Sequence, residues 1–141
     1  MKKIFLLFFS LALLTSCSSD DDERNAGDDK ILGKWFVAEI NNTGALNIEE
    51  NDCNRQSFID FKSNFKADSA LYAEDGGECN VNTSENDDWS IVGESKYRFV
   101  IPFEGIGAQS GRVDFNEDFT KFTFYPDLFL GQNTNIVFEK R

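Results

Sequence analysis

The sequence is poor in histidine, proline and positive charge. Its 141 residues contain no histidine, two prolines, and 14 Lys+Arg against 25 Asp+Glu, for a formal net charge of -11. Without histidine the chain cannot build Ser-His-Asp or Cys-His nucleophile systems or His-containing zinc sites. The deficit of cations argues against a surface for nucleic-acid phosphates. These absences favour binding over catalysis, and we expect no catalytic residue, no metal site and no cofactor.

The N-terminus has the order of a bacterial export signal. Two lysines precede an uncharged, apolar run over 4–14, which is shorter than the roughly 20 residues that a membrane-spanning helix needs. Leu14-Thr15-Ser16-Cys17 follows, and it resembles the lipobox of bacterial lipoproteins. The resemblance implies a signal peptide over 1–16 and a membrane anchor of acyl chains on Cys17. The alternative is an ordinary cleaved signal with an incidental cysteine.

An acidic segment comes directly after this cysteine. Residues 18–30 contain six acidic and two basic residues and no large apolar side chain, which predicts a disordered tether over 17–30. The stretch Ser19-Asp20-Asp21-Asp22-Glu23 resembles the export signal of Bacteroidetes lipoproteins. That resemblance implies an outer-membrane lipoprotein facing the cell exterior, and the alternative is a solvated spacer.

Residues 31–141 show the period-two alternation of β-strands. In the clearest case, 96–103, Tyr97 and Phe99 lie on one face and Arg98 on the other. No helical stripe of useful length occurs after residue 30. We expect an all-β domain of eight antiparallel strands, forming an up-and-down barrel or, alternatively, a sandwich. The expected strands are 31–40, 56–62, 65–73, 89–93, 96–103, 111–116, 119–125 and 135–140, with loops at 74–88 and 104–110.

Motifs at both ends of this domain suggest a family. Gly33-Lys34-Trp35, the cysteines at 53 and 79, and the C-terminal Phe138-Glu139-Lys140-Arg141 resemble the small lipocalin-like domains of Bacteroidetes lipoproteins. The resemblance implies that Gly33 lets the first strand bend and that Trp35 plugs the closed end of the barrel. It also implies that Lys140 or Arg141 stacks on the indole as a cation–π contact. The retinoid and haem ligands of larger secreted lipocalins are not implied.

Cys53 and Cys79 remain once Cys17 is lipidated. An even number of cysteines in an exported protein predicts a disulfide. A redox pair or metal site is disfavoured, because the sequence has no C-x-x-C motif and no histidine. We therefore expect a structural disulfide between these two residues.

Acidic residues crowd the two cysteine-bearing loops. A calcium site or a catalytic carboxylate pair would need a defined spacing that the pattern does not show, so solvated loop charge is the favoured interpretation. Separately, Asp68-Ser69-Ala70 resembles the O-glycosylation acceptor of Bacteroidetes proteins. The acidic residues are Asp52, Asp75, Glu78, Glu85, Asp87 and Asp88.

Six aromatic residues are expected to point into the barrel. They could line a site for an apolar ligand, but a barrel this small favours the interpretation that they fill the core. A binding module for a small apolar ligand or glycan predicts a cavity with an open mouth. An accessory subunit that contacts outer-membrane proteins predicts a filled barrel and an exposed apolar patch, and a carboxylate-based hydrolase is the least favoured function. The six are Phe61, Trp89, Tyr97, Phe99, Phe122 and Phe124.

Overall fold

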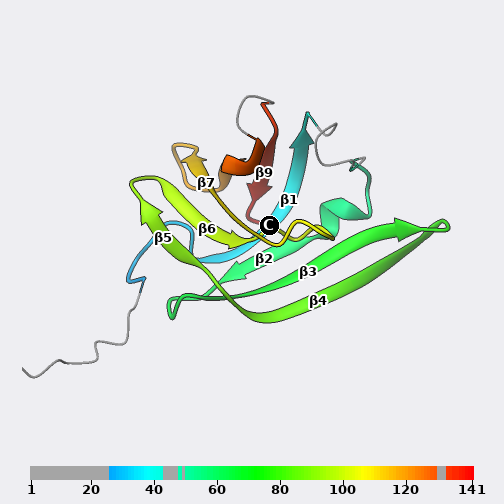
Figure 1. The fold of residues 1–141 in the computed structure, drawn as a ribbon, viewed down its shortest axis with the longest axis horizontal. Helices are drawn as coiled ribbons and strands as arrows, with labels where there is room; N and C mark the ends of the chain where they lie inside the picture. Colours follow the sequence, from blue (N-terminus) through cyan, green and yellow to red (C-terminus); the bar gives the residue numbers. More distant parts are fainter. Residues whose placement is uncertain (1–25, 43–47, 49, 130–132) are drawn as a thin grey trace, which may run out of the picture.

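The computed structural model describes residues 26–42, 48, 50–129 and 133–141 (Figure 1). Within these ranges the chain is all-β and antiparallel, as predicted. No helix among the described residues is long and apolar enough to cross a membrane. Cys17 and the acidic stretch Ser19–Glu23 lie outside the described residues. The strands are β1 (Gly33–Asn41), β2 (Phe58–Phe61), β3 (Lys66–Asp75), β4 (Glu78–Asp88), β5 (Ser90–Gly93), β6 (Lys96–Val100), β7 (Ala108–Phe115), β8 (Lys121–Pro126) and β9 (Asn135–Glu139), with 3-10 turns η2 (Asn54–Gln56) and η3 (Asp127–Phe129).

The strands form one curled sheet in the order β4-β3-β2-β1-β9-β8-β7-β6-β5. Two meanders, β1 to β4 and β5 to β9, meet where β1 pairs with β9. The two edge strands, β4 and β5, are consecutive in the chain and are separated only by Trp89. The sheet is therefore curled so that its two edge strands come from one continuous segment of the chain. We call this barrel-like body the barrel.

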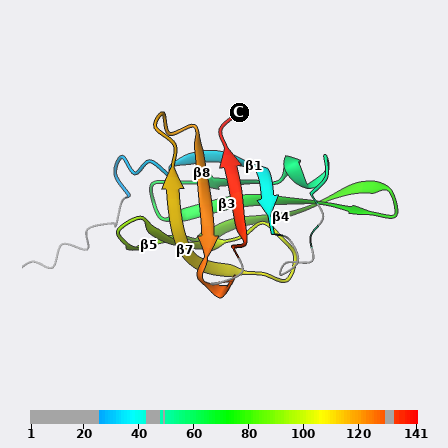
Figure 2. The same cartoon turned by 90° about the horizontal axis from the view of Figure 1, so that it is seen from above.

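A long hairpin of β3 and β4 projects from the barrel (Figures 1 and 2). Gly76 and Gly77 join its strands with φ of 62° and 85°, the positive values that a two-residue type I′ turn requires. The expected loop over 74–88 is therefore wrong, because these residues pair with β3 along most of their length. Residues 73–83 are solvent-exposed on both faces, so this segment lacks the alternation that marks a half-buried strand.

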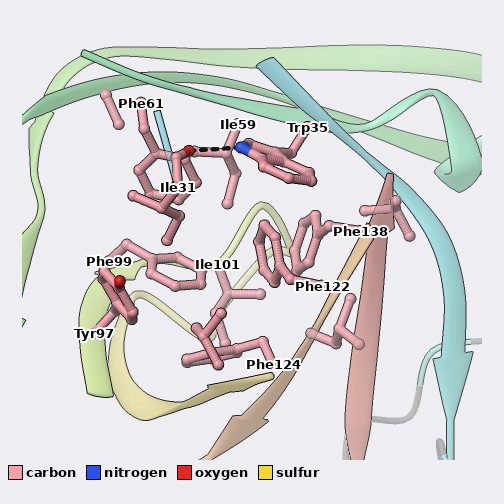
Figure 3. Close-up of a cluster of buried hydrophobic side chains, with 14 of the residues drawn as sticks. Ile31, Trp35, Ile59, Phe61, Tyr97, Phe99, Ile101, Phe122, Phe124 and Phe138 are labelled. Carbon is pink, nitrogen blue, oxygen red and sulfur yellow. Dashed lines mark hydrogen bonds between the residues drawn. The ribbon is translucent and has the colours of Figure 1, made fainter. Parts of the chain in front are cut away.

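The interior of the barrel is filled with aromatic and branched side chains (Figure 3). Trp35, Phe124 and Phe138 have no exposed surface, and Trp35 donates a hydrogen bond from Nε1 to the carbonyl oxygen of Ile31 at 2.5 Å. Phe122 lies between Trp35 and Phe138, with ring centroids 4.8 and 4.9 Å away. Burial of these large side chains supplies most of the driving force for folding.

Residues before the first strand also pack on the barrel. The Ala26 amide donates to the carbonyl oxygen of Ser63 at 2.7 Å, and Asp29 accepts a hydrogen bond from the Ile31 amide at 2.9 Å. Lys30 places its Nζ 4.2 Å from the ring centroid of Phe119. Residues 26–30, which we expected to belong to the tether, thus contact the barrel.

Candidate binding site at the mouth of the barrel

The predicted motif lies at the end of the barrel where β1 begins, which we call the closed end. Gly33 has φ of 102°, a value that disfavours any residue with a Cβ. Trp35 is fully buried beneath it, and Lys140 Nζ lies 4.5 Å from the centroid of the indole. Arg141 instead lies 4.9 Å from the Phe36 ring on the outside of the sheet. The expected cation–π contact is thus made by Lys140.

The six predicted lining aromatics lie together in the packed interior. Phe61 contacts Trp89 and Phe99 edge to face at 5.6 and 5.1 Å between centroids, and Phe124 lies 4.4 Å from Phe99. Phe122 belongs to the Trp35 cluster described above. These rings fill one another's space and leave none of the six on the wall of the mouth groove described below.

Tyr97 differs from the other five because it reaches the closed end. Its hydroxyl donates to the Asp29 carboxylate, with distances of 3.1 and 3.2 Å to the two oxygens. The pKa of Tyr97 is raised to about 12, mainly because the hydroxyl is buried and to a smaller extent because of the negative charge of Asp29 and this hydrogen bond. The contact joins the tether to β6.

The opposite end of the barrel carries an open groove of about 670 Å³, which we call the mouth groove (residues 48, 51, 54, 71–74, 76, 77, 103 and 104). Three parts of the chain form it: the segment before β2, the distal half of the β3–β4 hairpin, and the loop between β6 and β7. Ile48, Leu71 and Phe103 supply apolar surface, and Asn51 and Tyr72 supply hydrogen-bonding groups. The site can therefore accept a ligand with both apolar and polar surface.

A disulfide and several hydrogen bonds hold the hairpin over this groove. Cys53 and Cys79 are bonded, with their Cα atoms 5.6 Å apart, which confirms the predicted pairing. The Tyr72 amide donates to Ser57 Oγ at 2.9 Å. These contacts tie both hairpin strands to the segment before β2.

The same segment is also attached to β1. Glu50 accepts a hydrogen bond from the Ile40 amide at 2.9 Å and pairs with Arg55. The hydrogen bond from Ile40 and then the Arg55 guanidinium hold the pKa of Glu50 below its usual value. This wall of the groove is thereby fixed to β1 as well as to both hairpin strands.

Negative charge dominates the mouth groove. Glu74 and Glu104 are its charged lining residues, and the described lining contains no lysine or arginine. Basic residues gather instead around the closed end, where Lys30 and Lys140 cap aromatic rings. A neutral or cationic ligand fits this field better than an anion does.

The remaining predicted residues lie away from any chemical centre. Asp52 precedes η2, Asp75, Glu78, Glu85 and Asp87 lie on the hairpin strands, and Asp88 pairs with Lys66 at 2.5 Å. Across the described ranges, no three His, Cys, Asp or Glu side chains converge on a possible metal position. At about 670 Å³ the mouth groove is larger than two other hollows in the described part of the chain, of about 300 and 310 Å³.

The candidate glycosylation acceptor is part of the sheet. Ser69 is 9 % exposed and pairs with Ile59 and Ser84 in its neighbouring strands. Asp68 before it forms an ion pair with Lys62 at 2.5 Å, and this contact, with the Asn86 amide, lowers the pKa of Asp68. Ser69 thus lies within the sheet, where it also lines a hollow between β4 and the end of β6.

Sequence reasoning did not identify the residues that line the mouth groove. Leu71 and Phe103 lie near or at the ends of the expected strands 65–73 and 96–103. In a barrel, apolar residues at strand ends on one side of the sheet are the signal for a mouth. To recognise such residues one must know which strand ends lie on the same side of the barrel, and the pattern of a single strand does not contain this information.

The chain matches two known protein families. A family described as a lipocalin-like domain matches residues 31–105, which span β1 to β6. A second, described as a prokaryotic membrane lipoprotein lipid attachment site, matches residues 1–18. A comparison with curated proteins finds no match. The first match covers more than half of the 141 residues.

Proposed function

Because this chain belongs to the family of lipocalin-like domains and carries a lipoprotein lipid attachment site, we propose that it is a surface-exposed, outer-membrane binding protein. Lipocalin-like domains are typically binding proteins without catalytic activity. The ligand we propose is a small molecule with an apolar part, held at the mouth of the barrel rather than in its interior. This location follows from the packed core and the open groove above it.

The observation that carries the proposal is the mouth groove of about 670 Å³. Its volume lies within the range of small-molecule sites. Leu71 and Phe103 offer an apolar floor, while Glu74 and Glu104 disfavour anions. We therefore propose a neutral or cationic amphipathic ligand.

The attachment point orients this groove away from the membrane. Cys17 lies nine residues before Ala26, and Ala26 packs at the closed end through Ser63. In both views the start of the described chain and the hairpin tip lie on opposite sides of the molecule (Figures 1 and 2). An anchored protein would thus present its mouth to the surroundings.

Binding can be tested with Nile red, a neutral apolar dye. Ala73 lines the groove and its side chain is exposed, so Ala73→Trp should fill the groove and reduce dye affinity by about tenfold or more. Val81→Trp is the matched control, because Val81 is 52 % exposed on the same hairpin and outside the groove. Equal affinity of both variants and the parent protein would refute binding at the mouth.

Localisation can be tested with one variant and one protease. Cys17→Ala removes the acceptor of the lipid, so the protein should leave the membrane fraction, and its retention there would contradict the anchor. Proteinase K added to intact cells should digest the parent protein. Protection until the cells are lysed would show that it faces the periplasm.

A second candidate, an accessory subunit of an outer-membrane assembly, is favoured by the filled interior. Exposed apolar residues occur on β4, β5 and η3, as Val81, Ile91, Val92 and Leu128. Crosslinking of intact cells followed by purification distinguishes the two candidates. A stable stoichiometric complex without dye binding would favour the subunit.

A further inference from the structure

One edge of the projecting hairpin has no neighbouring strand. β4 is the last strand of the sheet on its side, and its ladder joins it to β3 alone. No backbone hydrogen bond among the described residues engages the outer edge of β4 over 78–83. An edge of this kind can accept another strand.

The turn geometry identifies the backbone groups that this edge offers. In a two-residue hairpin the residues that flank the turn, here Asp75 and Glu78, form a hydrogen-bonded pair. Hydrogen-bonded and non-hydrogen-bonded pairs alternate along the hairpin, so the pairs of residues 74 with 79, 72 with 81 and 70 with 83 are non-hydrogen-bonded. In such a pair the N–H and C=O groups of each residue point away from the partner strand. The hydrogen bond from the Tyr72 amide to Ser57 Oγ, on the side of β3 away from β4, supports this assignment. On β4 the outward residues are therefore Cys79, Val81 and Thr83.

Space for an added strand lies beside this edge. A hollow of about 300 Å³ lies between Asn82–Ser84 of β4 and Val100–Phe103 at the end of β6. Ser69 and Leu71 of β3 also line it, and it adjoins the mouth groove, with which it shares Leu71 and Phe103. β4 and β6 are not hydrogen-bonded to each other here, because β6 pairs with β5 and β7. The lateral wall of the barrel is open at this place.

The charge around the edge selects the partner. Glu74, Asp75, Glu78 and Glu85 are exposed on the two hairpin strands, and none of them forms an ion pair with another described residue. Lys66, the only basic residue on the two strands, is already paired with Asp88 at their barrel end. Two copies of the same acidic edge would repel each other, whereas a basic segment would be attracted.

We propose that the outer edge of β4 binds an extended, cationic segment of another protein as an added antiparallel strand. Main-chain hydrogen bonds to Cys79, Val81 and Thr83 supply the affinity, and lysine or arginine side chains at alternate positions meet the hairpin carboxylates. The edge lies on the hairpin, whose tip is on the opposite side of the molecule from the start of the described chain (Figure 1). The site uses backbone groups outside the mouth groove, so it does not depend on the ligand proposed above.

The test uses the lipidated full-length mature protein in a nonionic detergent and a synthetic peptide, acetyl-Lys-Val-Lys-Val-Lys-Val-Lys-amide. Val81→Pro removes one outward N–H, and proline is tolerated where that N–H faces solvent. Val81→Ala is the matched control that keeps the N–H. We expect Val81→Pro to weaken peptide binding by about tenfold, as loss of one or two net hydrogen bonds would, and Val81→Ala to bind as the parent does.

Two further peptides separate strand addition from simple charge attraction. A Lys-Val peptide with N-methyl groups on alternate amides keeps its charge and loses its hydrogen bonds, so it should not bind measurably. A Glu-Val peptide of the same length should fail for electrostatic reasons. Equal binding of either peptide, or of Val81→Pro, would overturn the proposal.

Two structural readouts complete the test. Amide hydrogen exchange at Val81 and Thr83 should slow when the Lys-Val peptide is bound, and unchanged exchange would contradict the assigned edge. Because a misfolded Val81→Pro would also lose binding, Glu78→Gln with Glu85→Gln serves as a second variant and should weaken binding without changing the backbone. A parent protein that dimerises through β4 would identify a second copy as the occupant and overturn the proposal.

Discussion

Removal of the disulfide should destabilise the domain in two separable ways. Cys53→Ser combined with Cys79→Ser opens a cross-link with a sequence separation of 26. For a loop of this length the chain-entropy relation assigns about 3.5 kcal/mol to restriction of the unfolded chain. That is a large part of the free energy of unfolding of a typical folded domain, which is roughly 5–15 kcal/mol.

The second effect is local, because the disulfide holds the exposed half of the hairpin. The hairpin has exposed side chains over 73–83. Its other links to the segment before β2 are the Tyr72–Ser57 hydrogen bonds and a contact from Gln56 Nε2 to Cys79 Sγ at 3.9 Å. Without the disulfide we expect faster hydrogen exchange at Ala73 and Asn80. Exchange at buried Phe99 should accelerate only by the amount that the global loss of stability requires.

Urea denaturation and hydrogen exchange, each with oxidised parent and double variant, measure both effects. We expect the midpoint to fall with little change in slope, corresponding to about 3 kcal/mol. A loss below about 0.5 kcal/mol would refute the argument from chain entropy. Uniform acceleration of all amides would refute the argument that the cross-link holds the hairpin locally.

Three other perturbations test the core and the closed end. The raised pKa of Tyr97 means that the folded state favours the neutral phenol, so the stability that the phenol contributes should be complete below about pH 10 and lost as the pH rises toward 12. In alkaline denaturation the Tyr97→Phe variant should not show this loss of stability. An identical pH profile for the variant and the parent would contradict the argument. Phe99→Ala should lower the free energy of unfolding, measured with urea, by about 3–5 kcal/mol. Phe119→Ala should lower it clearly less, because Phe119 is 38 % exposed. Equal losses would contradict the assigned core. Lys140→Met should reduce stability by about 0.5–1 kcal/mol through loss of the cation–π contact and alter Trp35 fluorescence, and an unchanged emission spectrum would contradict stacking at 4.5 Å.

The strands with one buried face were predictable from the sequence. β6 carries Tyr97 and Phe99 inward and Arg98 outward, and β9 carries Ile136 and Phe138 inward. Period two is a direct consequence of pleating over a core. The resemblance of Gly33-Lys34-Trp35 to a lipocalin-like motif predicts an unusual backbone at Gly33 and an inward-facing Trp35, and the structure has a positive φ at Gly33 and a buried Trp35.

β4 was not predictable by the same reasoning. Its side chains face water on both sides, so no burial distinguishes its even from its odd positions. Asparagine, aspartate and glutamate dominate it, and such residues also favour loops. It is a strand because it pairs with β3, follows the glycine turn and is linked to Cys53 by the disulfide. These features depend on distant residues or on the backbone conformation of the turn, which the local sequence pattern does not encode.

The location of the candidate site was also beyond a sequence pattern. Phe61 and Phe99 would show the same alternation whether they lined a cavity or filled it. Their ring contacts with each other and with Trp89 decide that they fill it. The mouth groove depends on where the hairpin and the loop after β6 end in space, which local alternation does not encode.

The single residue between β4 and β5 joins the two meanders of the sheet. Trp89 is buried and is held by two hydrogen bonds, from its amide to Phe65 and from its indole to Lys62. The strands on either side of it are largely exposed on both faces, so turning over their side chains would change little buried surface. A residue inserted at this junction would instead displace Trp89 and cost its burial and its hydrogen bonds. We therefore expect a change in chain length to be better tolerated at the exposed Gly76–Gly77 tip than at Trp89.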